Sequence, residues 1–181
     1  MEQIIFHIDV NSAYLSWSAL KNLADGSAVD LREIPSIIGG DMKKRHGVVL
    51  AKSIPAKAFG VTTGEPIVNA FRKCPHLILE SPDQRLYHKR SAELMEFLLD
   101  ICPDIEQVSV DECYMNYTTV AKRYGEPVSA ATKIRDRIYE TFGYTVNIGI
   151  SDRKVLAKMA SDFKKPNLVH TLFHDEIQEK M

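Results

Sequence analysis

Residues 107–115 have the sequence QVSVDECYM, and the runs on either side of Asp111 and Glu112, at 105–110 and 113–117, are rich in Val, Tyr and Ile. β-Branched and aromatic residues favour strands, so we predict strands at 105–109 and 113–117, joined by a tight hairpin. Successive side chains of a continuous strand point to opposite faces of a sheet. Only a turn or a bulge therefore lets both acids serve one site.

A third carboxylate, Asp9, follows the apolar run 4–8, which predicts another strand. Three acids at strand ends make an oxygen-rich site, and hard cations such as Mg²⁺ prefer carboxylate oxygen to His or Cys. Asp-Glu pairs also occur as solvated residues in turns. The acids alone therefore leave open whether the site binds metal or is merely part of a turn.

The 181 residues suffice for one large domain or two small ones. No apolar run approaches the roughly 20 residues that span a bilayer, and residues 1–3 lack the basic start of a secretory signal. We therefore expect no membrane partner. Cys74, Cys102 and Cys113 form no Cys-x-x-Cys pair, which fits a reducing cytoplasm and small buried side chains.

The net charge of −1 argues against the whole chain being a strong nucleic-acid binder. Phosphate contacts are normally supplied by an excess of Lys and Arg. Local basic clusters, at 43–45 and between 153 and 165, must carry any such role.

Hydrophobic periodicity and Gly or Pro punctuation predict alternating strands and helices. The expected strands are 4–8, 35–40, 48–51, 77–80, the hairpin strands, 145–150 and 170–172. The expected helices are 10–20, 54–61, 66–74, 87–101, 130–142, 153–163 and a last one from 175, with a polar hairpin tip at 43–47. Without the small elements near 23–77, this order indicates a ferredoxin-like α+β core with a mixed sheet and packed helices.

Two details of the predicted helices bear on the site. Asn11 or Ser12 can cap the helix that follows Asp9. Tyr14 falls in its first turn, and with Trp17 it could equally form a packed face. The last helix has under two turns and is marginal unless it packs on more protein. We therefore expect the chain to be cut from something longer.

Several short motifs occur in a fixed order along the chain: FHIDVNSAY at 6–14, GG at 39–40, GVV at 47–49, PAKAFGV at 55–61, SVDECY at 109–114, and GIS, LAK, ASD and KPN between 149 and 167. In this order they resemble the Y-family DNA polymerases of the bacterial DNA polymerase IV type. The resemblance covers residues 4–167, and the order of the motifs is more specific than any one of them.

The resemblance implies a palm domain at 1–22 and 78–170, an inserted fingers domain at 23–77, and the start of a truncated thumb at 171–181. It implies template-directed deoxynucleotidyl transfer in translesion synthesis, during DNA damage bypass and repair. The implied partners are primer-template DNA and deoxynucleoside triphosphates, with a sliding clamp contacted through parts expected after residue 181. The implied location is the cytoplasm.

The resemblance also assigns roles to residues. Asp9, Asp111 and Glu112 resemble the three catalytic carboxylates that hold two Mg²⁺ ions, with the Val10 carbonyl as a further ligand and Mn²⁺ as a substitute metal. Two such ions activate the primer 3′-hydroxyl and neutralise charge on the triphosphate. Tyr14 matches the steric gate, an aromatic ring that collides with a ribose 2′-hydroxyl.

Other matches concern the triphosphate. Lys165 matches a lysine that contacts it, and a compact ammonium suits that role. Ile54 and Lys57 stand where the family usually has Tyr and Arg, both of which grip the triphosphate. Lys57 keeps the charge but cannot form a bidentate fork, so nucleotide affinity is expected to be lower or its geometry altered. Leu168 replaces a frequent Gly.

Two other functions stay open from the sequence. Nucleotide cyclases use palm-like folds with paired acids, but their Gly-Gly-Asp-Glu-Phe type hairpin is replaced here by the segment 109–112. A degenerate palm that binds nucleotide or protein without turnover is the third interpretation. Ile54 and Lys57 support it, and the retention of all three acids, Tyr14 and Lys165 opposes it.

Overall fold

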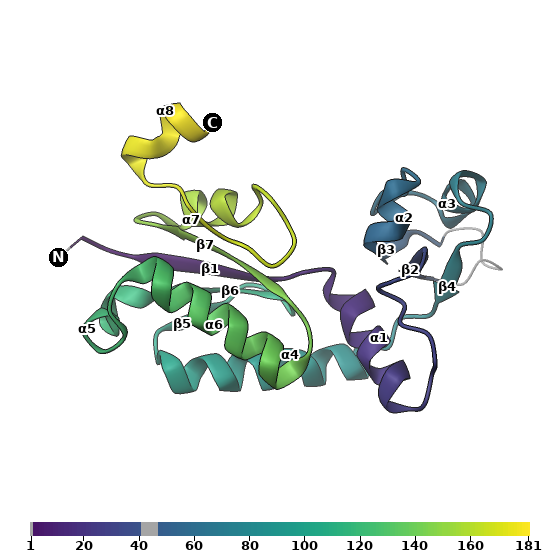
Figure 1. The fold of residues 1–181 in the computed structure, drawn as a ribbon, viewed down its shortest axis with the longest axis horizontal. Coiled ribbons are helices and arrows are strands. Elements are labelled where there is room, and N and C mark those ends of the chain that lie inside the picture. The colour runs from purple at the N-terminus through teal and green to yellow at the C-terminus, as the bar shows by residue number, and fades with distance from the viewer. Residues whose placement is uncertain (1, 41–46) are drawn as a thin grey trace. The chain divides into compact units, whose positions relative to one another are not determined.

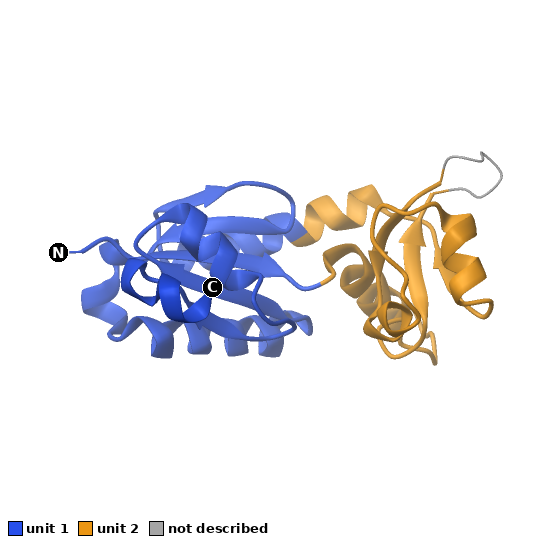
Figure 2. Cartoon of the chain, turned by 90° about the horizontal axis from the view of Figure 1, so that it is seen from above, with its two compact units in different colours: residues 1–11, 91–181 blue, residues 12–90 orange. Residues whose placement is uncertain are grey.

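The computed structural model describes residues 2–40 and 47–181. The chain forms two compact units, unit 1 from residues 1–11 and 91–181 and unit 2 from residues 12–90 (Figure 2). Each unit contains its own sheet. The basic tip predicted at 43–47 lies outside the described residues except for Gly47. No helix in the described part of the chain is both long and apolar enough to cross a membrane.

In the described part of unit 1, five strands form a mixed sheet in the order β5-β6-β1-β7-β8 (Figure 1). The strands are β1 (Ile5–Val10), β5 (Ile105–Gln107), β6 (Glu112–Asn116), β7 (Val146–Ser151) and β8 (Val169–Thr171). Neighbouring strands are antiparallel except β7 and β8, which are parallel. The central strands β1 and β7 are almost wholly buried, as their apolar sequences predict. The predicted mixed sheet is confirmed.

Helices cover both faces of this sheet. The longer helices are α4 (Gln84–Ile101), α6 (Pro127–Phe142) and α7 (Lys154–Ser161), and the short ones are α5 (Ala121–Tyr124) and α8 (Ile177–Lys180). In Figure 1, α7 lies on one side of β1 and β7, and α6 lies on the other. The fold class predicted from the sequence, an α+β core with packed helices, is therefore confirmed.

Two of these helices begin three residues earlier than the apolar periodicity predicts, because polar caps set their starts. The side chain of Glu126 accepts hydrogen bonds from the amides of Val128 and Ser129, and Pro127 suits the first turn of α6. Likewise the side chain of Asp83 accepts from the amide of Leu86 at the start of α4. Helix α5 was not predicted.

Unit 2 has a smaller sheet. Across its described residues the strand order is β3-β2-β4, with β2 antiparallel to β3 and parallel to β4. Its elements are α1 (Ala13–Ala24), β2 (Ser36–Gly39), β3 (Val49–Lys52), α2 (Ile54–Ala58), α3 (Ile67–Lys73) and β4 (Ile78–Glu80).

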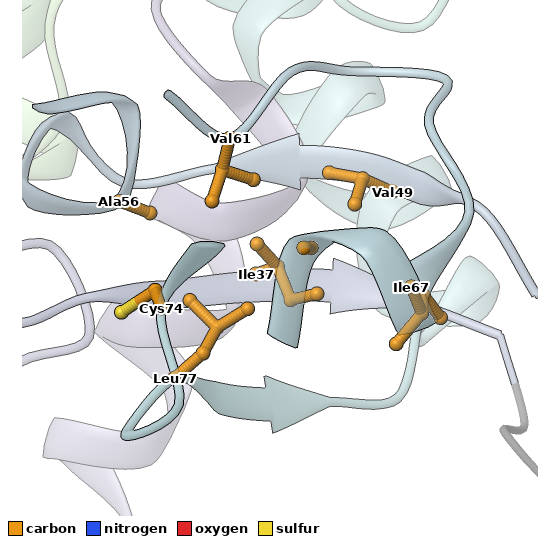
Figure 3. Packing of buried hydrophobic residues seen from close by; sticks show 8 residues of the cluster. Ile37, Val49, Ala56, Val61, Ile67, Cys74 and Leu77 are labelled. Carbon is orange, nitrogen blue, oxygen red and sulfur yellow. The ribbon is translucent and has the colours of Figure 1, made fainter. Parts of the chain in front are cut away.

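Adjacent residues of β2 point into two different apolar clusters, as strand geometry requires. Ile37 packs with side chains from β3, α2, α3 and the segments that follow the two helices (Figure 3), namely Val49, Ala56, Val61, Ile67, Ala70, Cys74 and Leu77. Ile38 packs with α1, in the cluster of Leu15, Ala19, Leu31 and Ala51. Unit 2 therefore has a layer of apolar side chains on each face of β2.

The predicted start and cap of the first helix are wrong. Val10 still belongs to β1, where it pairs with Val146, so α1 begins only at Ala13. Ser12 occupies the N-cap position with φ of 45°, and its side chain caps none of the described amides of the helix. The Asn11 side chain is used elsewhere, in contacts with Thr145 and Asn147.

The three cysteines are free thiols and buried, as the sequence predicts. Burial raises the pKa of Cys113 to about 12, so its thiolate is scarce at neutral pH. In the described part of the chain these side chains pack as small hydrophobes.

Gly149 provides a test of the packing between sheet and helix. A β-carbon added there would lie 1.9 Å from the carbonyl oxygen of Ala157 and 2.5 Å from the amide nitrogen of Ser161. Since both are backbone atoms of α7, we expect Gly149→Ala to lower the free energy of unfolding by about 3 kcal/mol or more, measured by urea denaturation. Gly40→Ala is the control, because its added carbon would meet its nearest atom at 3.6 Å. Equal losses in the two variants would contradict this packing.

Candidate functional site

The register of the central strands brings the predicted acids to one face of the unit 1 sheet. Asp9 in β1 pairs with Glu112 in β6 on one side and with Asn147 in β7 on the other. Directly opposite residues of antiparallel strands present their side chains to the same face. Glu112, Asp9 and Asn147 therefore form a row across three strands, which we call the acid row. Because Gly149 on the same face meets α7, this is the face that α7 covers.

Asp111 reaches the same place through an irregular connection. Its carbonyl oxygen accepts a hydrogen bond of 2.9 Å from the amide of Val10, which ties the connection to the end of β1. The amides of Val108 and Ser109 both donate to the carbonyl of Glu112, as in a bulge. Ser109 also donates to Asp111 Oδ1 at 2.6 Å. The irregular backbone therefore lies in residues 108–111, directly before Glu112.

Asp9 is largely enclosed, with 15% of its side chain exposed. Burial raises the pKa of its carboxyl, and the charges of Asp111 and Glu112 raise it further. Lys165 opposes this effect, because its Nζ lies 2.5 Å from Asp9 Oδ2. The same ammonium lies 2.9 Å from Asp162 Oδ1. Burial works to lower the pKa of Lys165, but these two carboxylates outweigh it and raise the pKa. The sequence motif assigns Lys165 to the triphosphate, and in the structure its ammonium lies beside Asp9.

Glu112 is held by two side chains that the sequence did not place beside it. Lys158 Nζ lies 3.0 Å and 3.1 Å from its two carboxylate oxygens. His7 Nε2 lies 3.2 Å from Glu112 Oε2, and His7 is only 1% exposed. The available signal for His7 was its place two residues before Asp9 in a predicted strand, which puts both side chains on one face.

Both ring nitrogens of His7 have polar partners. Burial lowers the pKa of His7, while the Glu112 carboxylate acts in the opposite direction. A carboxylate can only accept a hydrogen bond, so His7 Nε2 donates to Glu112. His7 Nδ1 lies 2.7 Å from Ser161 Oγ, and the Ser161 hydroxyl donates to the carbonyl of Lys158 at 2.7 Å. This chain of bonds links α7 to the acid row.

The donor set suits a hard cation, because carboxylate oxygens and the nearby Val10 carbonyl are the ligands that Mg²⁺ takes. Burial is the main cause of the raised pKa of Asp9, and the charges of Asp111 and Glu112 add to it. Within residues 2–40 and 47–181, however, no three His, Cys, Asp or Glu side chains converge as a ready metal cage. The cations in contact with Asp9 and Glu112 are the ammonium groups of Lys165 and Lys158.

The remaining predicted residues belong to unit 2. Tyr14 stacks on Tyr87, with ring centroids 4.2 Å apart, and is tilted against Trp17 at 6.5 Å. The packed face considered for Tyr14 and Trp17 is therefore real, although Tyr14 stays partly exposed. Lys57 and Ile54 lie on α2 and are exposed.

Comparisons with known proteins agree on one family. The model of the impB/mucB/samB family matches residues 8–162. DNA polymerase IV of Clostridium acetobutylicum is 48% identical over the whole chain, and that of Alkaliphilus oremlandii is 37% identical. The chain covers 46% and 44% of these proteins, so it spans about half the length of the relatives that it matches.

Solved structures give the same result. The crystal structure of DinB from Sulfolobus solfataricus matches with a TM-score of 0.82 and 25% identity, over 97% of this chain and 50% of that one. An insertion ternary complex of Dbh DNA polymerase matches with a TM-score of 0.81 and 26% identity, over the same shares. Together these matches confirm the resemblance found in the sequence motifs.

His7 provides a test of how the acid row is held. Since His7→Ala removes a buried donor to Glu112 and leaves a void, we expect it to lower the free energy of unfolding by about 2 to 3 kcal/mol, measured by urea denaturation. His88→Ala is the control, because His88 is exposed on α4 and its loss should change stability by under about 0.5 kcal/mol. A His7→Ala variant as stable as the control would show that the imidazole does not support Glu112.

Proposed function

The chain belongs to the impB/mucB/samB family, within the Y-family DNA polymerases, and we propose that it is the catalytic palm and fingers of a translesion DNA polymerase. The reaction is template-directed deoxynucleotidyl transfer during bypass and repair of DNA damage. One observation carries the proposal. Asp9 and Glu112 are in register on neighbouring strands, and Asp111 is tied to the end of the same central strand.

In this proposal the acids hold the catalytic metal. Asp9, Asp111, Glu112 and the Val10 carbonyl would hold two Mg²⁺ ions, with Mn²⁺ as a substitute. Bound there, such ions activate a primer 3′-hydroxyl and neutralise phosphate charge. Asp9 is held in place by the strand pairing on both of its sides, so its carboxylate is oriented before any ligand arrives.

The basic residues would serve the nucleotide. Lys165 sits beside Asp9 and is assigned to the triphosphate, since its compact ammonium suits a phosphate oxygen. Lys57, exposed on α2, is assigned to the triphosphate in place of the usual Arg. Tyr14 is assigned as the steric gate. These assignments rest on motif positions together with the contacts of each residue inside its own unit.

The wider context is part of the same proposal. The palm comprises residues 1–22 and 78–170, the fingers residues 23–77, and residues 171–181 begin a thumb. The partners are primer-template DNA, deoxynucleoside triphosphates and a sliding clamp bound by further parts of the polymerase. The cytoplasm is the proposed location. The related structures include ternary complexes of Dbh DNA polymerase, which support DNA and nucleotide as the ligand classes.

A second candidate is a nucleotide-binding module without turnover. It is favoured by the ion pairs of Lys165 with Asp9 and of Lys158 with Glu112, which occupy two of the acids. It is also favoured by Ile54, which has no donor for a phosphate. Primer extension separates the candidates, because a module without turnover would bind a triphosphate and release it unchanged.

We expect Asp111→Asn and Glu112→Gln each to reduce single-nucleotide insertion to less than about a tenth of the wild-type rate, because each removes a proposed metal ligand. The measurement is primer extension by the native gene product that carries this chain, alongside its thermal unfolding. Glu106→Gln is the matched control, an exposed acid of β5 that pairs with Lys154. Acid-site variants as active as this control would contradict the two-metal assignment.

Tyr14→Ala should raise insertion of ribonucleotides relative to deoxynucleotides, because it removes the ring proposed to collide with the 2′-hydroxyl. The readout is the ratio of kcat/KM for the two sugars, which cancels any general loss from breaking the stack on Tyr87. Tyr14→Phe keeps the ring and should keep the discrimination. If Tyr14→Ala discriminates as the wild type does, then Tyr14 is a packing residue.

A further inference from the structure

The third member of the acid row, Asn147, is a fully buried polar side chain at 0% exposure. Its Nδ2 donates to the carbonyls of Ser161 at 2.9 Å and Lys164 at 2.7 Å. Its Oδ1 accepts from the amide of Leu168 at 3.1 Å and from Asn11 Nδ2 at 3.3 Å. A carboxamide has two N–H donors and two acceptor lone pairs, so these four bonds use its full capacity.

Three of those bonds go to one stretch of chain, residues 161–168, which runs from the end of α7 to the start of β8. Asn147 binds this segment at its first residue, near its middle and at its last residue. Lys165 lies between the last two of these points. Its ammonium reaches Asp9 at 2.5 Å and Asp162 at 2.9 Å. The base of the lysine is therefore anchored by the strand next to the one that carries Asp9.

A second carboxamide extends the same attachment. Asn11 Oδ1 accepts from the hydroxyl of Thr145 at 2.9 Å and from the amide of Asn167 at 3.0 Å. Asn11 follows Asp9 by two residues, so the end of β1 is fastened to the segment as well. Two side-chain amides thus hold this segment to the sheet by hydrogen bonds, as backbone pairing would hold a further strand.

We propose that Asn147 is a positioning residue that holds segment 161–168 as a preformed support and so sets Lys165 at the acid row. Lys165 is a point charge on a long flexible stem, so its direction depends on where its backbone is fixed. A support ordered beforehand avoids the entropy cost of ordering a loop when a ligand binds. That the ligand of Lys165 is a triphosphate rests on the proposed function. That Asn147 holds the segment rests on the hydrogen bonds alone.

The first experiment measures how firmly segment 161–168 is held in the folded protein, without any nucleotide. Asn147→Ala removes the acceptor for the Leu168 amide, so that amide should exchange hydrogen at least about tenfold faster, and acetylation of Lys165 should speed up several-fold. Ser151→Ala is the matched control. Ser151 lies on the same strand and donates a buried hydrogen bond to the Leu172 carbonyl at 2.5 Å, away from the segment. Asn147→Ser serves the same purpose where the alanine variant does not fold. Exchange and labelling equal to those of Ser151→Ala would overturn the proposal.

The second experiment links the attachment to the substrate. In single-nucleotide insertion by the native gene product, Asn147→Ala should raise KM for the triphosphate about tenfold with a smaller change in kcat. In a Lys165→Ala background the same substitution should raise KM no further, because residues that act through one another are not additive. Equal increases in both backgrounds would overturn the link to Lys165.

The two experiments separate this inference from the function on which it rests. A native gene product that inserts no nucleotide would refute the proposed function and the triphosphate part of the inference. The exchange and labelling results would still decide whether Asn147 holds the segment.

Discussion

The pairing of β1 with β6 and β7 is the constraint on which the site depends. Its register sets Glu112, Asp9 and Asn147 side by side on one face and sends Ile8 and its opposite residues, Cys113 and Ile148, to the other. Because side chains alternate along a strand, a slip of one residue would bury the acids and expose the apolar core. The core residues that stabilise the sheet therefore also fix the chemistry of its other face.

This arrangement places three carboxylates close together, and their repulsion costs free energy. Burial and two neighbouring carboxylates raise the pKa of Asp9, so its ionised form is disfavoured relative to an exposed acid. Lys165 and Lys158 offset that cost by pairing with Asp9 and Glu112. A divalent cation would supply the same compensation with a larger charge. Under the proposed function, such a cation would take the carboxylate oxygens that the two lysines now contact, and an ammonium would then be free to meet phosphate.

The sequence predicts the elements of the fold well, because apolar periodicity and Gly or Pro punctuation are local signals. It predicts Asp9, Asp111, Glu112 and Lys165 through their motifs. It does not predict the partners of these residues. His7 bonds to Ser161 across 154 positions of the chain, and no local pattern marks such a pair. The error at Ser12 has the same origin, since a capping residue was expected to serve its own helix, while Asn11 beside it bonds to a distant strand.

All of these contacts depend on the absence of a side chain at Gly149. The backbone of α7 occupies the space that a β-carbon at Gly149 would need, so the end of the helix lies directly against the sheet. That approach lets Ser161 reach His7 and lets Asn147 reach the carbonyls of Ser161 and Lys164. A larger residue would lift the helix, and both lysines that contact the acids would move with it, because Lys158 is on α7 and Lys165 is in the segment that continues from its end. The geometry of the charged groups is therefore set by a backbone contact that carries no charge.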